Sequence, residues 1–334
     1  MLPFDLAMLV AIVLSIILLG FGAVILGMIM TGQIDLSDIL VESNENGSKK
    51  ASLSRLQFLI FSFVIAGLYL VICVESGTFV DVPPGVDNDV RPHPHIGLST
   101  ISHLYEGEIV HRDSTGVVQT IRPGELNVMT AGAGIVHSER APEMRRFAGG
   151  RAHGLQLWVA LPAANEDDPP SFAHHARDAL PSFERDGVRG RVLLGAAFGV
   201  VSPASTPSRP LLVELSMDAG ARIDLPDEVD DVGVYVVDGE LTRREGASAR
   251  THQLVVRRVG RSLALQARAP TRAVILGGAH LDGAPSRNPR HIEWNFVAST
   301  RERIEAAKRR WRAREFPTIQ GDSEERIPLP DELA

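Results

Sequence analysis

The chain has 334 residues, a formal net charge of −7 and 44% hydrophobic residues, which excludes a disordered chain and leaves room for two domains. The single cysteine, Cys73, excludes an internal disulfide framework and multi-thiolate zinc or iron–sulfur sites, so a bound metal would need histidine and carboxylate ligands. Residues 1–80 carry three basic and six acidic side chains, which leaves 31 against 35 in the remainder, and this near balance argues against direct binding to nucleic acid.

The N-terminal part contains two uncharged, apolar runs. Residues 6–30 are long enough to cross a hydrocarbon core of about 30 Å, and residues 56–74 form a second such run. A cleaved signal peptide is disfavoured for the first run, because Asp5 precedes it and no basic residue does. Buried soluble helices are disfavoured for both, because neither run has a polar stripe. Residues 1–80 are therefore predicted to be a membrane segment with two spanning helices, which places the protein at a membrane.

The loop between the two runs, residues 31–55, contains Lys49, Lys50 and Arg55, whereas no basic residue precedes the first run. The positive-inside rule would place this loop in the cytoplasm. The bias rests on three charges, so the side of the membrane that carries the remaining chain stays open.

After Thr78 the sequence changes to short apolar runs of strand length, separated by Gly, Pro, Asp and Asn. Residues 155–161, 232–237 and 273–276 are examples. This pattern is typical of an all-β barrel or sandwich.

Helical periodicity is found near the end, in residues 300–314, where Ser299 or Thr300 can cap the first turn. Acidic side chains such as Glu302 and Glu305 interleave with the basic run of this helix, which favours ion pairs on a solvated face over a nucleic-acid surface. The sequence therefore predicts an all-β fold with a C-terminal helix.

Two short motifs carry the chemical signal. His93 and His95 form an H-x-H pair, and residues i and i+2 of a strand point to the same side, so both imidazoles would project into one barrel interior. His137 and Glu139 repeat this spacing, so two neighbouring strands could deliver four ligands to one ion. Three nitrogens and one carboxylate oxygen suit Fe(II), Ni(II), Cu(II), Mn(II) or Zn(II) and leave positions open for water or substrate. We predict a reactive metal site; the alternative is a polar barrel mouth without metal.

The region around these motifs resembles the pirin family of bicupin proteins. The resemblance runs from about residue 83 to residue 330 and rests on RPHPHIG (91–97), YEGEI (105–109), HRDS (111–114), PGE (123–125), MTAGAGIVHSE (129–139), HGLQLWV (153–159) and FPTIQGDSEERIPLP (316–330). It implies two stacked β-barrel lobes: residues 83–180 with the metal site, and residues 181–334 without metal, ending in a helix and tail. It also implies that iron is held by His93, His95, His137 and Glu139.

The second lobe fits that pattern. Where a cupin would place another H-x-H, the chain reads DLPDE (224–228), and His252 and His280 have no partner at ligand spacing.

The resemblance further implies quercetin 2,3-dioxygenase activity on a small aromatic, flavonol-like substrate. Fe(II) is the metal it favours, although other first-row divalent metals fit the same donors. Glu139 is then the catalytic candidate, as both ligand and proton acceptor. The rival hypothesis is a non-enzymatic regulator that binds an unknown protein partner according to the redox state of the metal. A third is a membrane-tethered pirin fold without a competent pocket.

The chain departs from the family pattern in two places. Family members have further strands before the H-x-H pair, and here the membrane segment takes their place, so we expect an exposed sheet edge. The family commonly has Trp where this chain has Val128, so we expect a wider or looser pocket.

The remaining histidines allow more than one interpretation. By parity His103 faces the barrel interior, as a support for a ligand or as a core histidine. His111 and His153 follow the family pattern, and a role in orienting ligands and a structural role are both open. His174 and His175 are interpreted as linker surface.

Overall fold

The computed structural model describes residues 41–43, 49–51, 81–82, 89–143, 149–226, 229–243, 248–257, 262–283 and 290–332. The chain divides into two compact units, Met1–Val80 and Asp81–Ala334. In the first unit, strands β1 (Val41–Ser43) and β2 (Lys49–Ala51) form an antiparallel hairpin. The predicted spans, residues 6–30 and 56–74, lie outside the described residues and stay predictions. Among the described residues, no helix has both the length and the apolar character needed to cross a bilayer.

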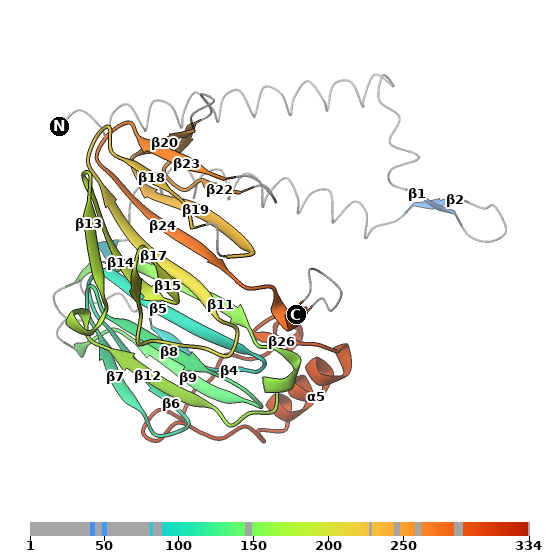
Figure 1. Ribbon diagram of the computed structural model, residues 1–334. Helices are drawn as coiled ribbons and strands as arrows, with labels where there is room; N and C mark the ends of the chain where they lie inside the picture. Colours follow the sequence, from blue (N-terminus) through green and yellow to red (C-terminus); the bar gives the residue numbers. More distant parts are fainter. Residues whose placement is uncertain are drawn as a thin grey trace, which may run out of the picture. The chain divides into compact units, whose positions relative to one another are not determined.

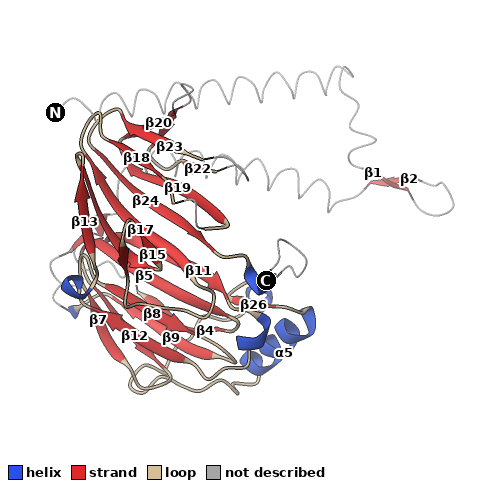
Figure 2. Ribbon diagram, in the orientation of Figure 1, coloured by secondary structure: helices blue, strands red, loops and turns tan. Residues whose placement is uncertain are grey.

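The second unit is built mostly from antiparallel strands, as Figure 2 shows, with a helix near its C-terminal end. Residues 90–175, which we call the first lobe, form two four-stranded sheets with the orders β4-β9-β6-β7 and β11-β5-β8-β12. The strands are β4 (Val90–His95), β5 (Leu98–Glu106), β6 (Ile109–Asp113), β7 (Val118–Ile121), β8 (Leu126–Thr130), β9 (Ile135–Arg140), β11 (His153–Ala160) and β12 (Ser171–His175).

Residues 182–278, the second lobe, form a six-stranded sheet with the order β13-β14-β17-β24-β19-β22 and a four-stranded sheet with the order β18-β23-β20-β21. The strands are β13 (Ser182–Arg185), β14 (Val188–Leu194), β17 (Pro210–Met217), β18 (Arg222–Asp224), β19 (Asp231–Asp238), β20 (Glu240–Arg243), β21 (Ser248–Arg250), β22 (Leu254–Val256), β23 (Ala264–Ala267) and β24 (Thr271–Gly278). Short pairs are β3 (Asp81–Val82) with β10 (Gly150–Arg151), and β15 (Ala196–Ala197) with β16 (Val200–Val201). Single 3-10 turns are η1 (Ala163–Asn165), η2 (Arg177–Ala179), η3 (Leu281–Gly283) and η4 (Pro330–Glu332).

The two lobes share an apolar layer. Ile101 of β5 and Val128 of β8 pack in one buried cluster with residues of the second lobe such as Leu212 and Val274. Figure 1 shows the first-lobe strands, teal to green, beside the yellow and orange strands of the second lobe. Because side chains alternate along a strand, the opposite face of the β5 sheet remains for the barrel interior. The shared layer therefore decides which residues of the first lobe can line a site.

The C-terminal segment packs on the first lobe, although it follows the second lobe in sequence. Strands β25 (His291–Glu293) and β26 (Phe296–Ala298) form a hairpin, and helix α5 (Arg301–Arg312) follows it. Thr300 caps the helix with its side chain, which confirms the predicted C-terminal helix and one of its two candidate caps. A buried cluster joins this segment to β9 and to the turn that follows β4: Ile96, Val136, Phe296, Ala298, Ile304, Ala307, Trp311, Phe316, Ile319 and Leu329.

Lys308 and Arg312 of α5 have acidic partners. Lys308 contacts Glu293 at 2.5 Å and Glu305 at 3.2 Å. Arg312 pairs with Asp331 in the tail. The Lys308–Glu305 pair lies within the helix, as the charge pattern predicted, whereas the other two contacts hold the helix to neighbouring parts of its own segment.

Two glycines allow the turns beside the ligand strands to pack closely. Gly97 follows β4 with a φ of +64°, and a Cβ there would lie 2.0 Å from the carbonyl oxygen of Val297. Gly132 precedes β9 with a φ of +50°, and its Cβ would lie 1.9 Å from the carbonyl oxygen of Asp168. A side chain at either position would be strained and would also collide with backbone, so both turns require glycine.

The packing of the C-terminal segment predicts a large effect for Phe296→Ala. Phe296 is completely buried, so its truncation should lower the free energy of unfolding by about 3–5 kcal/mol. Ile292→Ala, on the paired strand, is the control, because Ile292 is 68% exposed and should cost about 0.5 kcal/mol or less. Urea unfolding of the full-length chain measures both. A Phe296→Ala chain as stable as the parent would show that the segment does not depend on this contact.

Candidate metal centre

Strands β4 and β9 bring three histidines together on the barrel interior. His93 lies opposite His137 in the antiparallel ladder, and His95 follows two residues along β4. One ligand nitrogen from each lies within 4.8 Å of the other two. The three side chains are buried, with exposed fractions of 6% for His93 and 1% for His95 and His137. The structure therefore joins two segments that are far apart in the sequence.

Backbone carbonyls decide which ring nitrogen of His93 and His95 carries the proton. Nδ1 of His93 lies 2.8 Å from the carbonyl oxygen of Arg91, and Nδ1 of His95 lies 3.0 Å from that of Asn295 in the β25–β26 turn. A carbonyl oxygen only accepts, so both Nδ1 atoms donate and both Nε2 atoms keep a lone pair. Ligating histidines usually hold their second nitrogen in this way.

Burial keeps the three rings uncharged. Desolvation lowers the pKa of His93 to about 4 and that of His95 to about 3, and it lowers the pKa of His137 well below the ordinary value. Neighbouring histidines lower the pKa of His95 and His137 further. At neutral pH the site therefore offers neutral imidazoles, which is the form that binds a metal.

The distance between two of these nitrogens fits a shared ion. Nε2 of His95 lies 3.0 Å from Nε2 of His137. Two nitrogen ligands at about 2.1 Å from one ion and at right angles are about 3 Å apart. A set of three imidazoles suits first-row divalent metals, so the residues present fit the metal that their pattern predicted.

Glu139 lies beside this group and is not a member of it. Its Oε1 accepts a hydrogen bond of 2.5 Å from the side-chain amide of Gln156, which also lies 3.2 Å from Oγ of Ser102. Burial raises the pKa of Glu139, and the bond from Gln156 opposes that shift. Its roles as fourth ligand and as catalytic acid or base remain predictions.

The site faces solvent along β11. Gln156 and Trp158 are exposed, whereas Leu155, Leu157 and Val159, which alternate with them, pack against the layer shared with the second lobe. Trp158 is 43% exposed, and its ring meets the His95 ring edge-on at a centroid distance of 5.2 Å. Among the described strands, β11 pairs with β5 alone. The motif HGLQLWV already contained this alternation. Because alternate residues of a strand share a face, the sequence could have placed Gln156 and Trp158 together on the site side.

Two residues expected near the metal face the other way. His103 lies two residues after Ile101 on β5, so both side chains point to the same face, toward the second lobe. There Nε2 of His103 lies 3.6 Å from Oε2 of Glu214. Val128 packs in the shared apolar layer, so the expectation that it widens the metal pocket is wrong. The alternative that His103 is a core histidine fits its exposed fraction of 1%. The two expected directions are wrong because of the shared layer, since the sequence alone does not say which face of β5 and β8 is covered by another lobe.

His174 also differs from its interpretation as linker surface. It belongs to β12, and its Nδ1 lies 2.8 Å from Oδ1 of Asn127. The preceding acidic, proline-rich residues 165–170 suggested a linker, but the strand pairs with β8 inside the first lobe.

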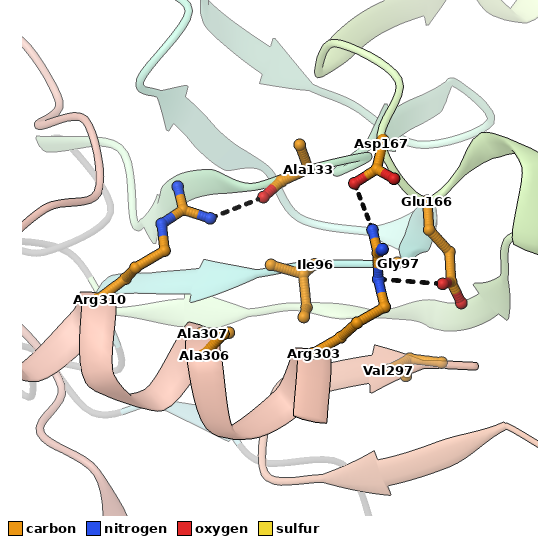
Figure 3. A pocket seen from close by; sticks show the side chains of 10 residues that line it. All are labelled: Ile96, Gly97, Ala133, Glu166, Asp167, Val297, Arg303, Ala306, Ala307 and Arg310. Atoms are coloured by element: carbon orange, nitrogen blue, oxygen red, sulfur yellow. Dashed lines mark hydrogen bonds and ion pairs between the residues drawn. The ribbon is translucent and has the colours of Figure 1, made fainter. Parts of the chain in front are cut away.

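A hollow of about 240 Å³ lies between α5 and the turn that follows His95 (Figure 3). Arg303 of α5 pairs there with Asp167 and, at 3.2 Å, with Glu166. Arg310 donates to the carbonyl oxygen of Ala133 at 3.1 Å. These contacts attach the helix to the segment that follows β11 and to the turn that precedes β9.

Known proteins resemble this chain in both sequence and structure. The family model described as "Pirin" matches residues 73–159, and "Pirin C-terminal cupin domain" matches residues 212–317. A pirin-like protein of Caulobacter vibrioides is 43% identical over 246 residues, which are 73% of this chain and 82% of that protein. Pirin of Rattus norvegicus is 31% identical over 64% of this chain and 73% of its own length. A solved quercetin 2,3-dioxygenase from Acinetobacter baumannii is 32% identical, with a TM-score of 0.68 over 76% of this chain and 82% of that one.

The lowered pKa values predict how the stability of the metal-free chain depends on pH. The folded pKa values of His93 and His95, about 4 and about 3, lie below the value of 6.5 for an ordinary histidine. Below pH 6.5 the unfolded chain therefore binds protons that the folded chain does not, so the free energy of unfolding falls as the pH falls. Each histidine contributes up to about 1.4 kcal/mol per pH unit until its folded pKa is reached.

Urea unfolding in the presence of EDTA at pH 7 and pH 5 measures this loss. His95→Asn keeps an N–H donor for the Asn295 carbonyl but does not titrate, so it should lose less stability than the parent. His252→Asn is the control, because His252 is exposed and its left-handed backbone also suits asparagine. Equal losses in the parent and in His95→Asn would contradict the assignment of His95 as a buried neutral ring.

Proposed function

The chain belongs to the pirin family, and on this premise we propose that it is a metal-dependent dioxygenase that acts on a small, flat aromatic substrate of the flavonol type. The observation that carries the proposal is the convergence of three buried, neutral imidazoles within 4.8 Å of one another. The similarity to a solved quercetin 2,3-dioxygenase supports the choice of substrate class.

Fe(II) is the proposed metal, and Ni(II), Cu(II), Mn(II) and Zn(II) suit the same imidazole donors. His93, His95 and His137 would hold it, with Glu139 as the proposed fourth ligand. When bound, the metal supplies a Lewis acid and a redox centre beside which an enolate-type oxygen of the substrate and O2 can be held.

Glu139 is the proposed proton acceptor. Its pKa is raised by burial, so its carboxylate is a stronger base than an exposed one and can take the proton of a substrate hydroxyl. Gln156 orients it, because the amide holds Oε1 at 2.5 Å and leaves the second oxygen to serve in turn as metal ligand and as proton acceptor. A partly buried carboxylate that is hydrogen-bonded on one side fits a group that gains and loses a proton in place.

Trp158 supplies an aromatic surface at the opening. It is partly exposed and contacts the ring of the ligand His95, so a flat substrate can pack against it while its oxygens face the three histidines. Expulsion of water between the two rings would strengthen the polar contacts within the site.

Oxygen uptake by the Fe(II)-loaded full-length chain with quercetin tests the proposal. His95→Ala removes a ligand and should lower uptake by at least about 100-fold together with the iron content. Glu139→Gln removes the proton acceptor and should lower turnover by about 100-fold or more with a smaller change in iron content. His252→Asn, in the second lobe, is the control and should leave both unchanged.

Two results would overturn this function. Uptake that is unchanged in His95→Ala would show that the three histidines do not carry the reaction. A parent chain that binds iron stoichiometrically but consumes no oxygen with quercetin would favour the regulatory hypothesis.

A further inference from the structure

The ligand His137 is oriented differently from the other two ligands. His93 and His95 use backbone carbonyls, whereas Nδ1 of His137 lies 3.4 Å from Nδ1 of His111 on the neighbouring strand β6. Nε2 of His111 in turn lies 2.9 Å from Oδ2 of Asp113. A chain of three side chains therefore runs from a buried carboxylate to the metal centre.

The proton positions along this chain follow from its carboxylate end. The ionised Asp113 only accepts, so Nε2 of His111 carries a proton and donates it. A metal on Nε2 of His137 requires the proton of that ring on Nδ1, and Nδ1 of His111, 3.4 Å away, is placed to accept the hydrogen bond from it. In this arrangement His137 donates from Nδ1, and its Nε2 keeps a lone pair on the side where Nε2 of His95 lies.

Several contacts fix the two residues behind His137. Oδ1 of Asp113 accepts from the amide of Thr115 at 2.8 Å and from its hydroxyl at 2.6 Å, and also from the amide of Val117 at 3.4 Å. Burial raises the pKa of Asp113, but the hydrogen bonds from His111 and Thr115 outweigh it and hold the pKa below the usual value. The ring of Phe172 stacks on that of His111 at a centroid distance of 4.6 Å and an angle of 24°.

We infer that His111 and Asp113 are positioning residues of the metal centre: they hold His137 in the tautomer whose Nε2 lone pair faces the metal. The inference rests on the proposed function only in taking His93, His95 and His137 as the ligands. Asp113, which is 1% exposed, would also provide a buried negative charge near a bound divalent ion. This charge reduces the cost of placing a cation among neutral groups.

Asp113→Asn should exchange the donor and acceptor roles in the two hydrogen bonds that run from position 113 through His111 to His137. Thr115 and Val117 donate to Oδ1 of residue 113, so the side-chain oxygen of the new asparagine must stay on their side. Its side-chain nitrogen then takes the place of Oδ2 and donates to Nε2 of His111. The proton of His111 then moves to its Nδ1, which donates to His137. His137 is left with its proton on Nε2, where the metal would bind.

The first experiment reads the tautomers directly. The full-length chain is labelled with ¹⁵N-histidine, freed of metal, and the ring nitrogen shifts are assigned. The parent should show His137 protonated on Nδ1, and Asp113→Asn should show it protonated on Nε2. Asp218→Asn is the control, because Asp218 is exposed and pairs with Arg189 in the second lobe, so it should leave His137 unchanged.

The second experiment measures Co(II) affinity by calorimetry. Asp113→Asn should weaken binding by about 10–100-fold. His111→Asn and His111→Leu form a matched pair of nearly equal size, of which Asn alone keeps an acceptor for Nδ1–H of His137. The Asn variant should therefore retain most of the affinity, and the Leu variant should lose about 10-fold or more. Equal losses in the two would mean that His111 acts only by packing against Phe172, which would overturn the inference.

The tautomer result decides the case if the Leu variant does not fold. A parent chain with His137 protonated on Nε2, or an Asp113→Asn chain with the parent's tautomer, would overturn the inference. Failure of the proposed function would be a different result. A parent chain that binds Co(II) but, in its iron form, consumes no oxygen with quercetin would overturn the proposed function and would not affect the inference about His111 and Asp113.

Discussion

The site depends on the mutual approach of imidazole lone pairs in a buried space. Burial lowers the pKa of His93, His95 and His137, so none of the rings relieves the approach by taking up a proton at neutral pH. Nε2 of His95 and Nε2 of His137 nevertheless lie 3.0 Å apart. With His137 in the tautomer inferred above, two lone pairs face each other at this distance and repel in a medium of low dielectric constant, and a shared cation would turn the repulsion into binding. The surrounding fold must therefore hold the rings in place, and its packing can be understood from this requirement.

Each ligand ring is held by a different part of the chain. His93 uses the backbone of its own strand, His95 uses the β25–β26 turn of the C-terminal segment, and His137 uses His111 and Asp113 of β6. The C-terminal segment packs on the outer face of the strands whose inner face carries the ligands. The shared layer with the second lobe covers the outer face of the other sheet. The second lobe and the tail thus support the centre without contributing a ligand from the residues that the structure describes.

Strand β11 borders the three histidines on the side that faces solvent. A closed ligand shell is typical of structural metal sites, whereas these three histidines are bordered by exposed Gln156 and Trp158 and by the carboxylate of Glu139. Successive residues of β11 point to opposite faces of the sheet. Its apolar residues therefore pack on the second lobe and support the site, while the residues between them border the site on the solvent side. This division explains how one short motif, HGLQLWV, serves both the core and the site.

The spacing of residues along the chain was enough to predict two features of this protein. The two-residue repeat placed His93 and His95 on one side of a strand, and the cap and period of residues 300–314 predicted α5, because such relations involve only neighbours along the chain. Tertiary structure decided the rest. His103 and Val128 face the second lobe, Glu139 binds Gln156, Asn295 orients His95, and the tail lies on the first lobe. These contacts join residues that are far apart in sequence, and which face of a strand is covered depends on the element that packs there. A sequence pattern records the alternation of a strand but not the identity of its neighbour.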